Sequence, residues 1–292
     1  MKASAFAYAR ATSVGNALEL LAAHGSKAKV LSGGQSLLPA MNLRLISPEF
    51  IVDIGELDVL RGIVVSGDVL AIGALTRHVD LLKSAKIALH APLLADAVAH
   101  VAHPAIRNRG TLGGSLAHAD PASELPACML ALDATIVVRG ESSERRIAAA
   151  EFFKGIYETA LLATELLVAI EFPIARENSA HFFEEFSRRR GDYAIVGLAA
   201  QAIVEGSILR HLRLAFFAIG DRPVLAKAAN RLVNVEITPA LVLGALAALD
   251  EELDPYDDQQ ASPAMRRHLA KVLLSRCVST LVGRPEFAGA AA

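Results

Sequence analysis

Cysteine is scarce in this sequence. The 292 residues include only two cysteines, Cys128 and Cys277. Two thiols cannot hold an iron–sulfur cluster by themselves, and their spacing does not match a zinc site. The sequence therefore predicts that this chain binds no metal. So few cysteines are also typical of a protein in a reducing compartment rather than of a disulfide scaffold, so we expect a cytoplasmic location.

The sequence also lacks an excess of charge of one sign and a long apolar run. Lys and Arg number 29 and Asp and Glu number 31, so the formal net charge is −2. That balance argues against nucleic-acid binding, which needs a strong positive field. No stretch approaches the roughly 18 uninterrupted apolar residues of a membrane helix. Residues 1–11 lack the apolar run of a signal peptide. We therefore expect no integral membrane segment and no targeting segment.

What is present predicts a globular protein. Apolar residues make up 53% of the chain and charged residues 21%, which excludes disorder as its overall state. At about 150 residues per domain, the length favours two domains. Apolar periodicity and capping residues predict helices over 14–22, from Thr76 to Leu82, over 92–101 and from Ser123 to Leu132. Strands are expected over 28–31, 50–54, 135–139 and 166–172, and a hairpin over 62–73. Residues 103–121 are expected to form a loop.

The order of predicted elements changes after Pro173, and the polar residues 175–179 are the best candidate for a linker between two domains. Beyond them, residues 181–187, 194–204 and 208–218 read as three strands, the last two joined by a tight turn. The remainder is helical, and Thr238-Pro239 and Ser262-Pro263 each combine a capping residue with a proline at the first helical position. This order predicts a small α+β domain with a three-stranded antiparallel sheet.

A glycine-rich stretch follows the strand expected over 28–31. This first glycine loop reads Val30, Leu31, Ser32, Gly33, Gly34, Gln35, Ser36 and Leu37. Glycine lets the backbone approach a phosphate closely, and consecutive N–H groups can bind its oxygens. An ordinary strand-to-helix turn is the alternative. The stretch is neither a Rossmann fingerprint nor a P-loop.

The second glycine loop, residues 106–121, has the same ingredients and is longer. It contains Gly113-Gly114-Ser115 and ends in His118-Ala119-Asp120-Pro121. A polar loop of this size in an apolar chain is usually functional or disordered. Two such loops could hold the two phosphates of one dinucleotide.

Three segments together resemble a known family. Residues 33–39, residues 106–121 and the Arg-x-Gly-Asp-Tyr-Ala stretch of residues 189–194 are similar to the medium, FAD-binding subunits of molybdenum hydroxylases. That family includes bacterial carbon monoxide dehydrogenases and N-heterocycle and aldehyde hydroxylases, and xanthine dehydrogenases carry the same module in a longer chain. The resemblance covers nearly the whole sequence, and the second glycine loop is its most specific part.

The resemblance implies an α+β fold in two parts. Residues 1–175 would form an FAD-binding domain of the vanillyl-alcohol-oxidase/PCMH type, with subdomains of about 1–57 and 58–175. Residues 176–288 would form the small C-terminal domain of carbon monoxide dehydrogenase flavoproteins, with its three-stranded antiparallel sheet and helices.

The resemblance also implies which residues hold FAD. Residues 30–37 and 111–115 would surround the pyrophosphate, Glu124 would lie on the adenosine side, Leu167 beside the adenine or the flavin, and Tyr193 over the isoalloxazine. The implied cofactor-binding residues are Val30, Leu31, Ser32, Gly33, Gly34, Gln35, Ser36, Leu37, Val101, Ile106, Thr111, Leu112, Gly113, Gly114, Ser115, Ala117, His118, Asp120, Glu124, Leu167 and Tyr193. No residue is expected to be an essential general acid or base, because the flavin supplies the redox chemistry.

The implied function is electron transfer within a larger complex. The substrate would be hydroxylated at a molybdenum cofactor in a large subunit, and electrons would pass through two [2Fe–2S] clusters in a small subunit to this FAD. The complex would be a dimer of heterotrimers. The low cysteine count fits that division, because this chain has too few ligands for either cluster.

Two other functions stay open at this point. One is a stand-alone FAD reductase resembling the enolpyruvyl-UDP-N-acetylglucosamine reductases, which the second glycine loop fits poorly. The other is a nucleotide-binding regulatory module without a flavin.

One departure from the family also matters: relatives often carry a lysine just before the Arg-Arg-x-Gly-Asp stretch, whereas this chain has Glu184 and Glu185.

Overall fold

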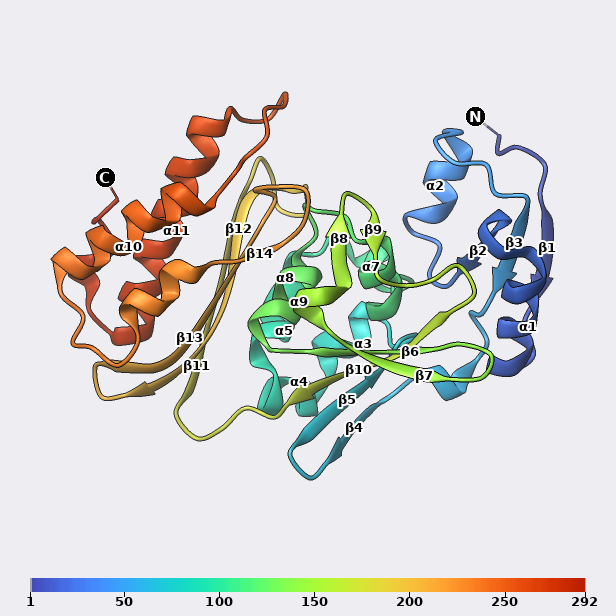
Figure 1. Cartoon of the computed structure of the whole chain (residues 1–292), viewed down its shortest axis with the longest axis horizontal. Coiled ribbons are helices and arrows are strands. Elements are labelled where there is room, and N and C mark those ends of the chain that lie inside the picture. The colour runs from blue at the N-terminus through green and yellow to red at the C-terminus, as the bar shows by residue number, and fades with distance from the viewer. Residues whose placement is uncertain (1, 292) are drawn as a thin grey trace.

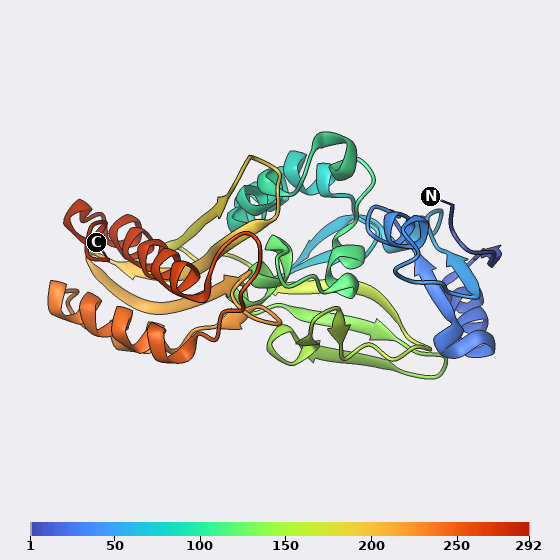
Figure 2. The ribbon, with the colours of Figure 1, turned by 90° about the horizontal axis from the view of Figure 1, so that it is seen from above.

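The computed structural model describes residues 2–291. Its elements form three groups in a row along the longest axis of the molecule (Figure 1). A small sheet with α1 lies at one end, a larger sheet with short helices lies in the middle, and a third sheet backed by α10 and α11 lies at the other end. Figure 2 shows from a second direction that the N-terminal group and the C-terminal helices occupy opposite ends.

The N-terminal group is a parallel three-stranded sheet. Its strands β1 (Ala7–Arg10), β2 (Ala28–Leu31) and β3 (Phe50–Asp53) lie in the order β1-β3-β2. Helix α1 (Val14–His24) begins where Ser13 accepts a hydrogen bond from the Asn16 amide and ends at Gly25. Helix α2 (Leu37–Asn42) follows the first glycine loop directly. The α/β unit expected here is confirmed, and the short, largely exposed β1 is an addition to it.

The middle group is an antiparallel sheet in the order β4-β5-β10-β6-β7. Its strands are β4 (Ile63–Ser66), β5 (Val69–Gly73), β6 (Thr135–Arg139), β7 (Glu144–Ala148) and β10 (Leu166–Pro173). The helices around it are α3 (His78–Lys83), α4 (Ala85–His90), α5 (Pro92–His100), α6 (Pro104–Arg107), α7 (Leu112–His118), α8 (Glu124–Ala131) and α9 (Ala149–Phe152), and a small hairpin is formed by β8 (Phe153–Gly155) and β9 (Glu158–Thr159).

Two local predictions in this group are wrong. Residues 103–121 are not one loop, because they hold α6 and α7. The double glycine that suggested a loop instead allows close packing: a Cβ on Gly113 would lie 2.6 Å from the Ala74 Cβ. Thr76 does not cap α3, because its hydroxyl bonds both the N–H and the carbonyl of Gly62 at 3.1 Å.

The C-terminal group is a sheet of four antiparallel strands. It consists of β11 (Ser179–Ser187), β12 (Ala194–Glu205), β13 (Ile208–Phe217) and β14 (Val224–Leu225). The three expected strands are confirmed, but the expected count of three is wrong, because β14 is too short to show alternation in the sequence. Helices α10 (Pro239–Glu252) and α11 (Pro263–Val282) begin at Thr238 and Ser262, whose hydroxyls cap them as predicted.

Both faces of this sheet are covered, which explains the long apolar runs of its strands. On one face it packs against α5 and α8 of the middle group, and on the other it packs against α10 and α11 (Figure 1). Cys128 lies buried in the hydrophobic core between the sheet and the middle group, and Cys277 lies buried in the core between the sheet and the C-terminal helices. Among the helices of residues 2–291, none is both long enough and apolar enough to cross a bilayer.

Candidate cofactor site

The fold brings the two glycine loops into contact. The Thr111 hydroxyl lies 3.3 Å from the Ser32 hydroxyl, and it also accepts a hydrogen bond from the Gly114 amide at 3.2 Å. A Cβ on Gly114 would lie 2.6 Å from the Ser32 Oγ. A Cβ on Gly33 would lie 2.9 Å from the carbonyl carbon of Arg109 and closer still to its oxygen. Glycine is therefore needed at Gly33, where a Cβ would meet backbone, whereas at Gly114 the Ser32 and Thr111 hydroxyls would have to move.

A cavity of about 380 Å³ opens beside this contact. From the two loops it is lined by Leu31, Ser32, Gly33, Gly34, Arg109 and Thr111. Four arginines line it, namely Arg10, Arg61, Arg77 and Arg109, and so do the carboxylates of Asp53 and Glu56, which both pair with Arg10. Within residues 2–291, Arg10 and Arg61 form ion pairs with nearby carboxylates, whereas Arg77 and Arg109 form none. Sequence reasoning missed Arg77, which an isolated bridge holds opposite Thr111.

These residues suit a dinucleotide diphosphate. Two side-chain hydroxyls and the backbone of three glycines meet at one place, and arginines without carboxylate partners lie beside them. Hydroxyl and amide hydrogens bind phosphate oxygens, and the planar guanidinium group matches their geometry. The site therefore fits the diphosphate of FAD.

A second group of predicted site residues gathers around Asp120, which is buried. The Tyr157 hydroxyl donates to Asp120 Oδ2 at 3.5 Å, and the Tyr157 ring lies 4.8 Å from the ring of His118. Loss of solvation and the Asp120 carboxylate raise the pKa of Tyr193 to about 12. Tyr193 is 60% exposed, so it does not lie in the core, although it directly precedes β12. Tyr157 and the nearby Tyr256 carried no sequence signal.

The segment before β12 packs against the turn between α5 and α6. Gly191 has φ +87°, and a Cβ there would lie 2.8 Å from the carbonyl oxygen of Ala102. Arg107 donates to the carbonyls of Val101 and Ala102 at 2.8 and 2.9 Å, which fixes this turn. Gly191, two residues before Tyr193, thereby lies against Ala102, which is two residues beyond the end of α5.

The structure scatters the other predicted site residues. Leu167 lies buried in β10 within the core of the middle group, and Leu112 is buried in α7. Gln35 donates to the carbonyl of Gly33 at 2.9 Å, so it stiffens its own loop. Ser115 bonds Ser123 at 3.2 Å through the two hydroxyls. The remaining members are half-buried or exposed within their segments, and they are Val30, Ser36, Leu37, Ile106 and Ala117.

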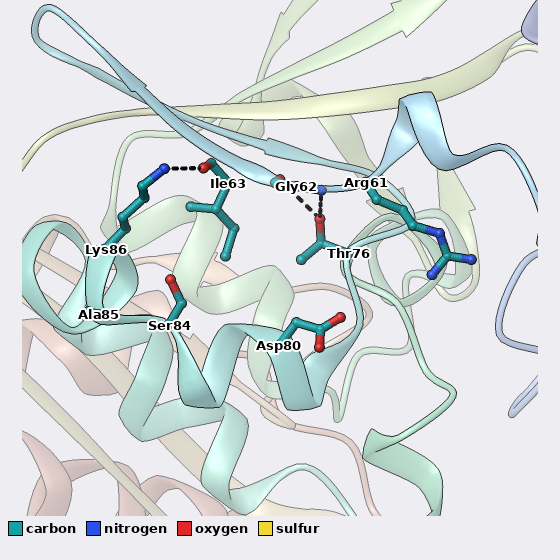
Figure 3. Close-up of a pocket in the computed structure, with 8 residues that line it drawn as sticks. All are labelled: Arg61, Gly62, Ile63, Thr76, Asp80, Ser84, Ala85 and Lys86. Carbon is teal, nitrogen blue, oxygen red and sulfur yellow. Dashed lines mark hydrogen bonds between the residues drawn. The ribbon is translucent and has the colours of Figure 1, made fainter.

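A larger hollow of about 460 Å³ lies outside the glycine loops (Figure 3). Its lining residues are Arg61, Gly62, Ile63, Thr76, Asp80, Ser84, Ala85 and Lys86. Lys86 donates to the carbonyl of Ile63 at 2.8 Å, and Thr76 bonds the backbone of Gly62. These polar groups therefore bind the protein itself, and only Arg61 also lines the cavity beside the loops.

A buried histidine under the second glycine loop makes the fold sensitive to acid. Neither ring nitrogen of His78 has a hydrogen-bond partner within residues 2–291, and burial lowers its pKa to about 4. The unfolded chain binds the proton more readily below about pH 6.5, so the free energy of unfolding falls from there toward pH 4, by about 3 kcal/mol in all.

His78→Leu should abolish this loss, as measured by urea unfolding between pH 7 and pH 4. His90→Leu, on the neighbouring helix, should keep it; an unchanged pH profile in His78→Leu would refute the assignment.

The fold and the glycine-loop site together define an FAD-binding flavoprotein chain, and comparison with known proteins agrees. Residues 4–175 match the family described as the FAD binding domain in molybdopterin dehydrogenase. Residues 181–281 match the CO dehydrogenase flavoprotein C-terminal domain. The chain belongs to the FAD-binding medium-subunit family of the molybdenum hydroxylases.

Individual relatives span almost the same length. The alpha subunit of the 6-hydroxypseudooxynicotine dehydrogenase complex of Paenarthrobacter nicotinovorans is 38% identical over 97% of each chain. The carbon monoxide dehydrogenase medium chain of Hydrogenophaga pseudoflava is 34% identical over 96% of this chain and 98% of the relative. The solved carbon monoxide dehydrogenase of that organism superposes with a TM-score of 0.95 at 34% identity, covering 97% of this chain and 99% of the other. Quinoline 2-oxidoreductase of Pseudomonas putida 86 gives a TM-score of 0.91 at 37% identity, with the same coverage.

Proposed function

We propose that this chain is the FAD-carrying electron-transfer subunit of a molybdenum-containing hydroxylase or dehydrogenase complex. The contact between the two glycine loops, beside a cavity lined by arginines, carries the proposal. Ser32, Gly33, Gly34, Thr111 and Gly114 would bind the diphosphate. When bound, FAD supplies the redox chemistry, and the protein holds and orients it. Both cysteines are buried in the hydrophobic cores, and we expect non-covalent FAD.

The finer description of the fold belongs to the same proposal. Residues 1–175 would be an FAD-binding domain of the vanillyl-alcohol-oxidase/PCMH type, with subdomains of about 1–57 and 58–175, and residues 176–288 would be the C-terminal domain. The family matches over 4–175 and 181–281 support this division. The separate sheet of each segment supports it as well. The predicted contacts of Val101, Ile106, Leu167 and the other cofactor-binding residues are part of this proposal.

The partners follow from the nature of the relatives, which are subunits of dehydrogenase complexes. Electrons would reach this FAD from two [2Fe–2S] clusters in a small subunit, after substrate oxidation at a molybdenum cofactor in a large subunit. We propose a dimer of heterotrimers in the cytoplasm. The two buried free thiols of this chain are consistent with that location and with clusters held elsewhere.

A reconstitution experiment tests this function against the reductase alternative. The flavin-loaded chain, mixed with the small iron–sulfur subunit of its own complex, should be reduced when that subunit is reduced. The chain alone should not oxidise NADPH in the presence of enolpyruvyl-UDP-N-acetylglucosamine. The opposite pair of results would support a reductase. Relatives that are named as subunits or chains of larger enzymes favour the first outcome.

The exposed Tyr193 gives a prediction on the reoxidation step. We expect its ring to screen the flavin from small oxidants. Tyr193→Ala should therefore speed reoxidation by dioxygen about two- to tenfold, which corresponds to losing one aromatic contact. Stopped-flow absorbance of the isolated, reduced chain measures the rate, and FAD content should stay unchanged.

Tyr193→Phe is the matched control, because it keeps the ring and removes the hydroxyl near Asp120. Its reoxidation rate should stay close to that of the wild type. An unchanged rate in a fully flavinated Tyr193→Ala chain would mean that another segment screens the flavin.

A further inference from the structure

Three of the four tyrosines of this chain gather at one place on its surface. Tyr157 lies between β8 and β9, Tyr193 directly precedes β12, and Tyr256 lies between α10 and α11. All three rings are exposed to solvent, and the chain contains no tryptophan. Tyrosine is enriched where proteins contact each other, so an exposed cluster of tyrosines is a candidate interface.

Tyr157 is held against the second glycine loop by its backbone and by its side chain. Its amide donates to the carbonyl of Ala119 at 3.2 Å, and its hydroxyl donates to Asp120 Oδ2 at 3.5 Å. Its ring lies 4.8 Å from the ring of His118. Tyr157 therefore packs on three successive residues at the end of this loop.

One buried arginine joins Tyr256 to the same loop. Arg266 donates to the carbonyl of Ala218 at 2.8 Å, and the Ala218 amide donates to the carbonyl of Pro121, also at 2.8 Å. Pro121 is the last residue of the second glycine loop. The guanidinium carbon of Arg266 lies 4.3 Å from the centre of the Tyr256 ring. A single side chain therefore connects this ring with the end of the loop.

Arg266 also fixes the start of β12. It donates to the carbonyl of Ile195, two residues beyond Tyr193. The Asp120 carboxylate contributes to the raised pKa of Tyr193, which agrees with this placement. Printed contacts thus bring the segments of all three tyrosines to the end of the second glycine loop.

The hairpin of β8 and β9 presents two apolar residues at its tip. Gly155 pairs with Glu158, so Ile156 and Tyr157 form a two-residue turn. Ile156 is 63% exposed and Tyr157 is 57% exposed. Tyr157 has φ +57°, a conformation that glycine or asparagine usually supplies in such a turn. An exposed isoleucine and a strained tyrosine gain nothing in solvent, whereas both gain buried area against a partner.

Charged side chains surround this tip. Lys154 and Glu158 flank it in the hairpin, and Asp221 and Arg222 lie beside it after β13. The Arg222 guanidinium donates to the carbonyl of Lys154 at 2.9 Å. All four side chains are exposed. An apolar and aromatic centre within a polar rim is the usual anatomy of a protein–protein interface.

We propose that Ile156, Tyr157, Tyr193 and Tyr256, here called the tyrosine surface, dock the small iron–sulfur subunit. The inference rests on the proposed function. Relatives are subunits of larger enzymes, and the two buried cysteines of this chain cannot hold iron–sulfur clusters. Electrons therefore reach FAD across an interface. Electron transfer slows steeply with distance, so this interface lies beside the flavin, and Tyr193 is the residue expected over the isoalloxazine.

A charge at the hairpin tip tests the docking. Ile156→Asp changes an exposed side chain, so the chain should fold and keep its FAD, but docking would bury an unpaired carboxylate. The Kd of the flavin-loaded chain for the small iron–sulfur subunit should rise about thirtyfold or more, as measured by isothermal titration calorimetry. Reduction of FAD by that subunit should slow at concentrations below this Kd, whereas reduction by dithionite should keep its rate.

Leu89→Asp is the matched control. Leu89 is 70% exposed and lies in α4, on the opposite side of the middle group from β8 and β9 (Figure 1). This variant should bind the iron–sulfur subunit like the wild type. Equal Kd values for the wild type and Ile156→Asp would overturn the proposal. Slower reoxidation would then assign the tyrosine surface to an external electron acceptor, and a changed sedimentation coefficient would assign it to a second copy of this chain.

Hydrogen exchange gives a readout that needs no variant. The amides of residues 153–160 should exchange more slowly when the iron–sulfur subunit is bound, and those of α4 should keep their rates. Unchanged exchange over 153–160 in the formed complex would also overturn docking at this surface. A flavin-loaded wild-type chain that does not bind the iron–sulfur subunit at all would instead count against the proposed function itself.

Discussion

Replacing Gly33 with alanine should weaken the binding of FAD to the chain. The added Cβ would lie 2.9 Å from the carbonyl carbon of Arg109 and nearer to its oxygen, and both are backbone atoms that cannot rotate away. The two glycine loops would have to separate, at a cost typical of overpacking of about 1–3 kcal/mol. We expect FAD affinity to fall about five- to a hundredfold, as measured by flavin fluorescence titration.

Gly244→Ala is the matched control for this change. Gly244 lies in α10, and a Cβ there would meet nothing within 4 Å. Its replacement should leave FAD binding unchanged and stabilise the helix slightly. Circular dichroism should show that Gly33→Ala keeps its secondary structure. Full FAD affinity in a folded Gly33→Ala chain would mean that the contact between the loops does not form the site.

Loss of the buried Arg266 should be the most destabilising single change in the C-terminal group. Its guanidinium lies in the core, donates to the carbonyls of Ile195 and Ala218, and pairs with Asp258 at 2.7 Å. Its CZ lies 4.3 Å from the centre of the Tyr256 ring. Arg266→Met would leave two carbonyls without this donor and remove the ion-pair partner of Asp258, which keeps the amides of Gln260 and Ala261. We expect a loss of about 3–5 kcal/mol in the free energy of unfolding, measured by urea denaturation.

Arg210→Met tests whether burial causes this effect. Arg210 pairs with Glu205 at 2.7 Å, but both side chains are exposed. An exposed pair contributes about 1 kcal/mol or less, so this variant should unfold almost like the wild type. Equal losses in the two variants would contradict the special role of Arg266. Because Arg266 anchors the segment that carries Tyr256, its loss should also loosen the surroundings of Asp120.

Features that depend on a few neighbouring residues could be predicted from the sequence. Ser13, Thr238 and Ser262 cap their helices because each hydroxyl reaches an amide three residues ahead. The alternation of the hairpin over 62–73 was equally local. Thr76 was misassigned because its hydroxyl is engaged by Gly62, which lies 14 residues earlier and joins it only through the sheet.

The residues of the candidate cofactor site also divide into those that the local sequence predicts and those that only the fold brings together. The glycine loops were visible because each is continuous in the sequence, and the sequence paired them only as holders of the two phosphates of one dinucleotide. Their direct contact through Ser32 and Thr111 appears only in the folded chain. Arg77 and Tyr157 were missed because only the folded chain brings them to the loops. The contact between His100 and Glu185 could not be predicted for the same reason: the two residues are 85 apart in the chain, and nothing in either local sequence marks the other.

Acid denaturation of the purified, flavin-loaded chain tests the central claim most directly. The claim is that two glycine loops hold FAD by non-covalent contacts to its diphosphate. One FAD per chain should therefore appear free in the supernatant, and the Gly33→Ala chain purified in parallel should release much less. Yellow colour that stays with the precipitated protein, or equal FAD release from both chains, would contradict the claim.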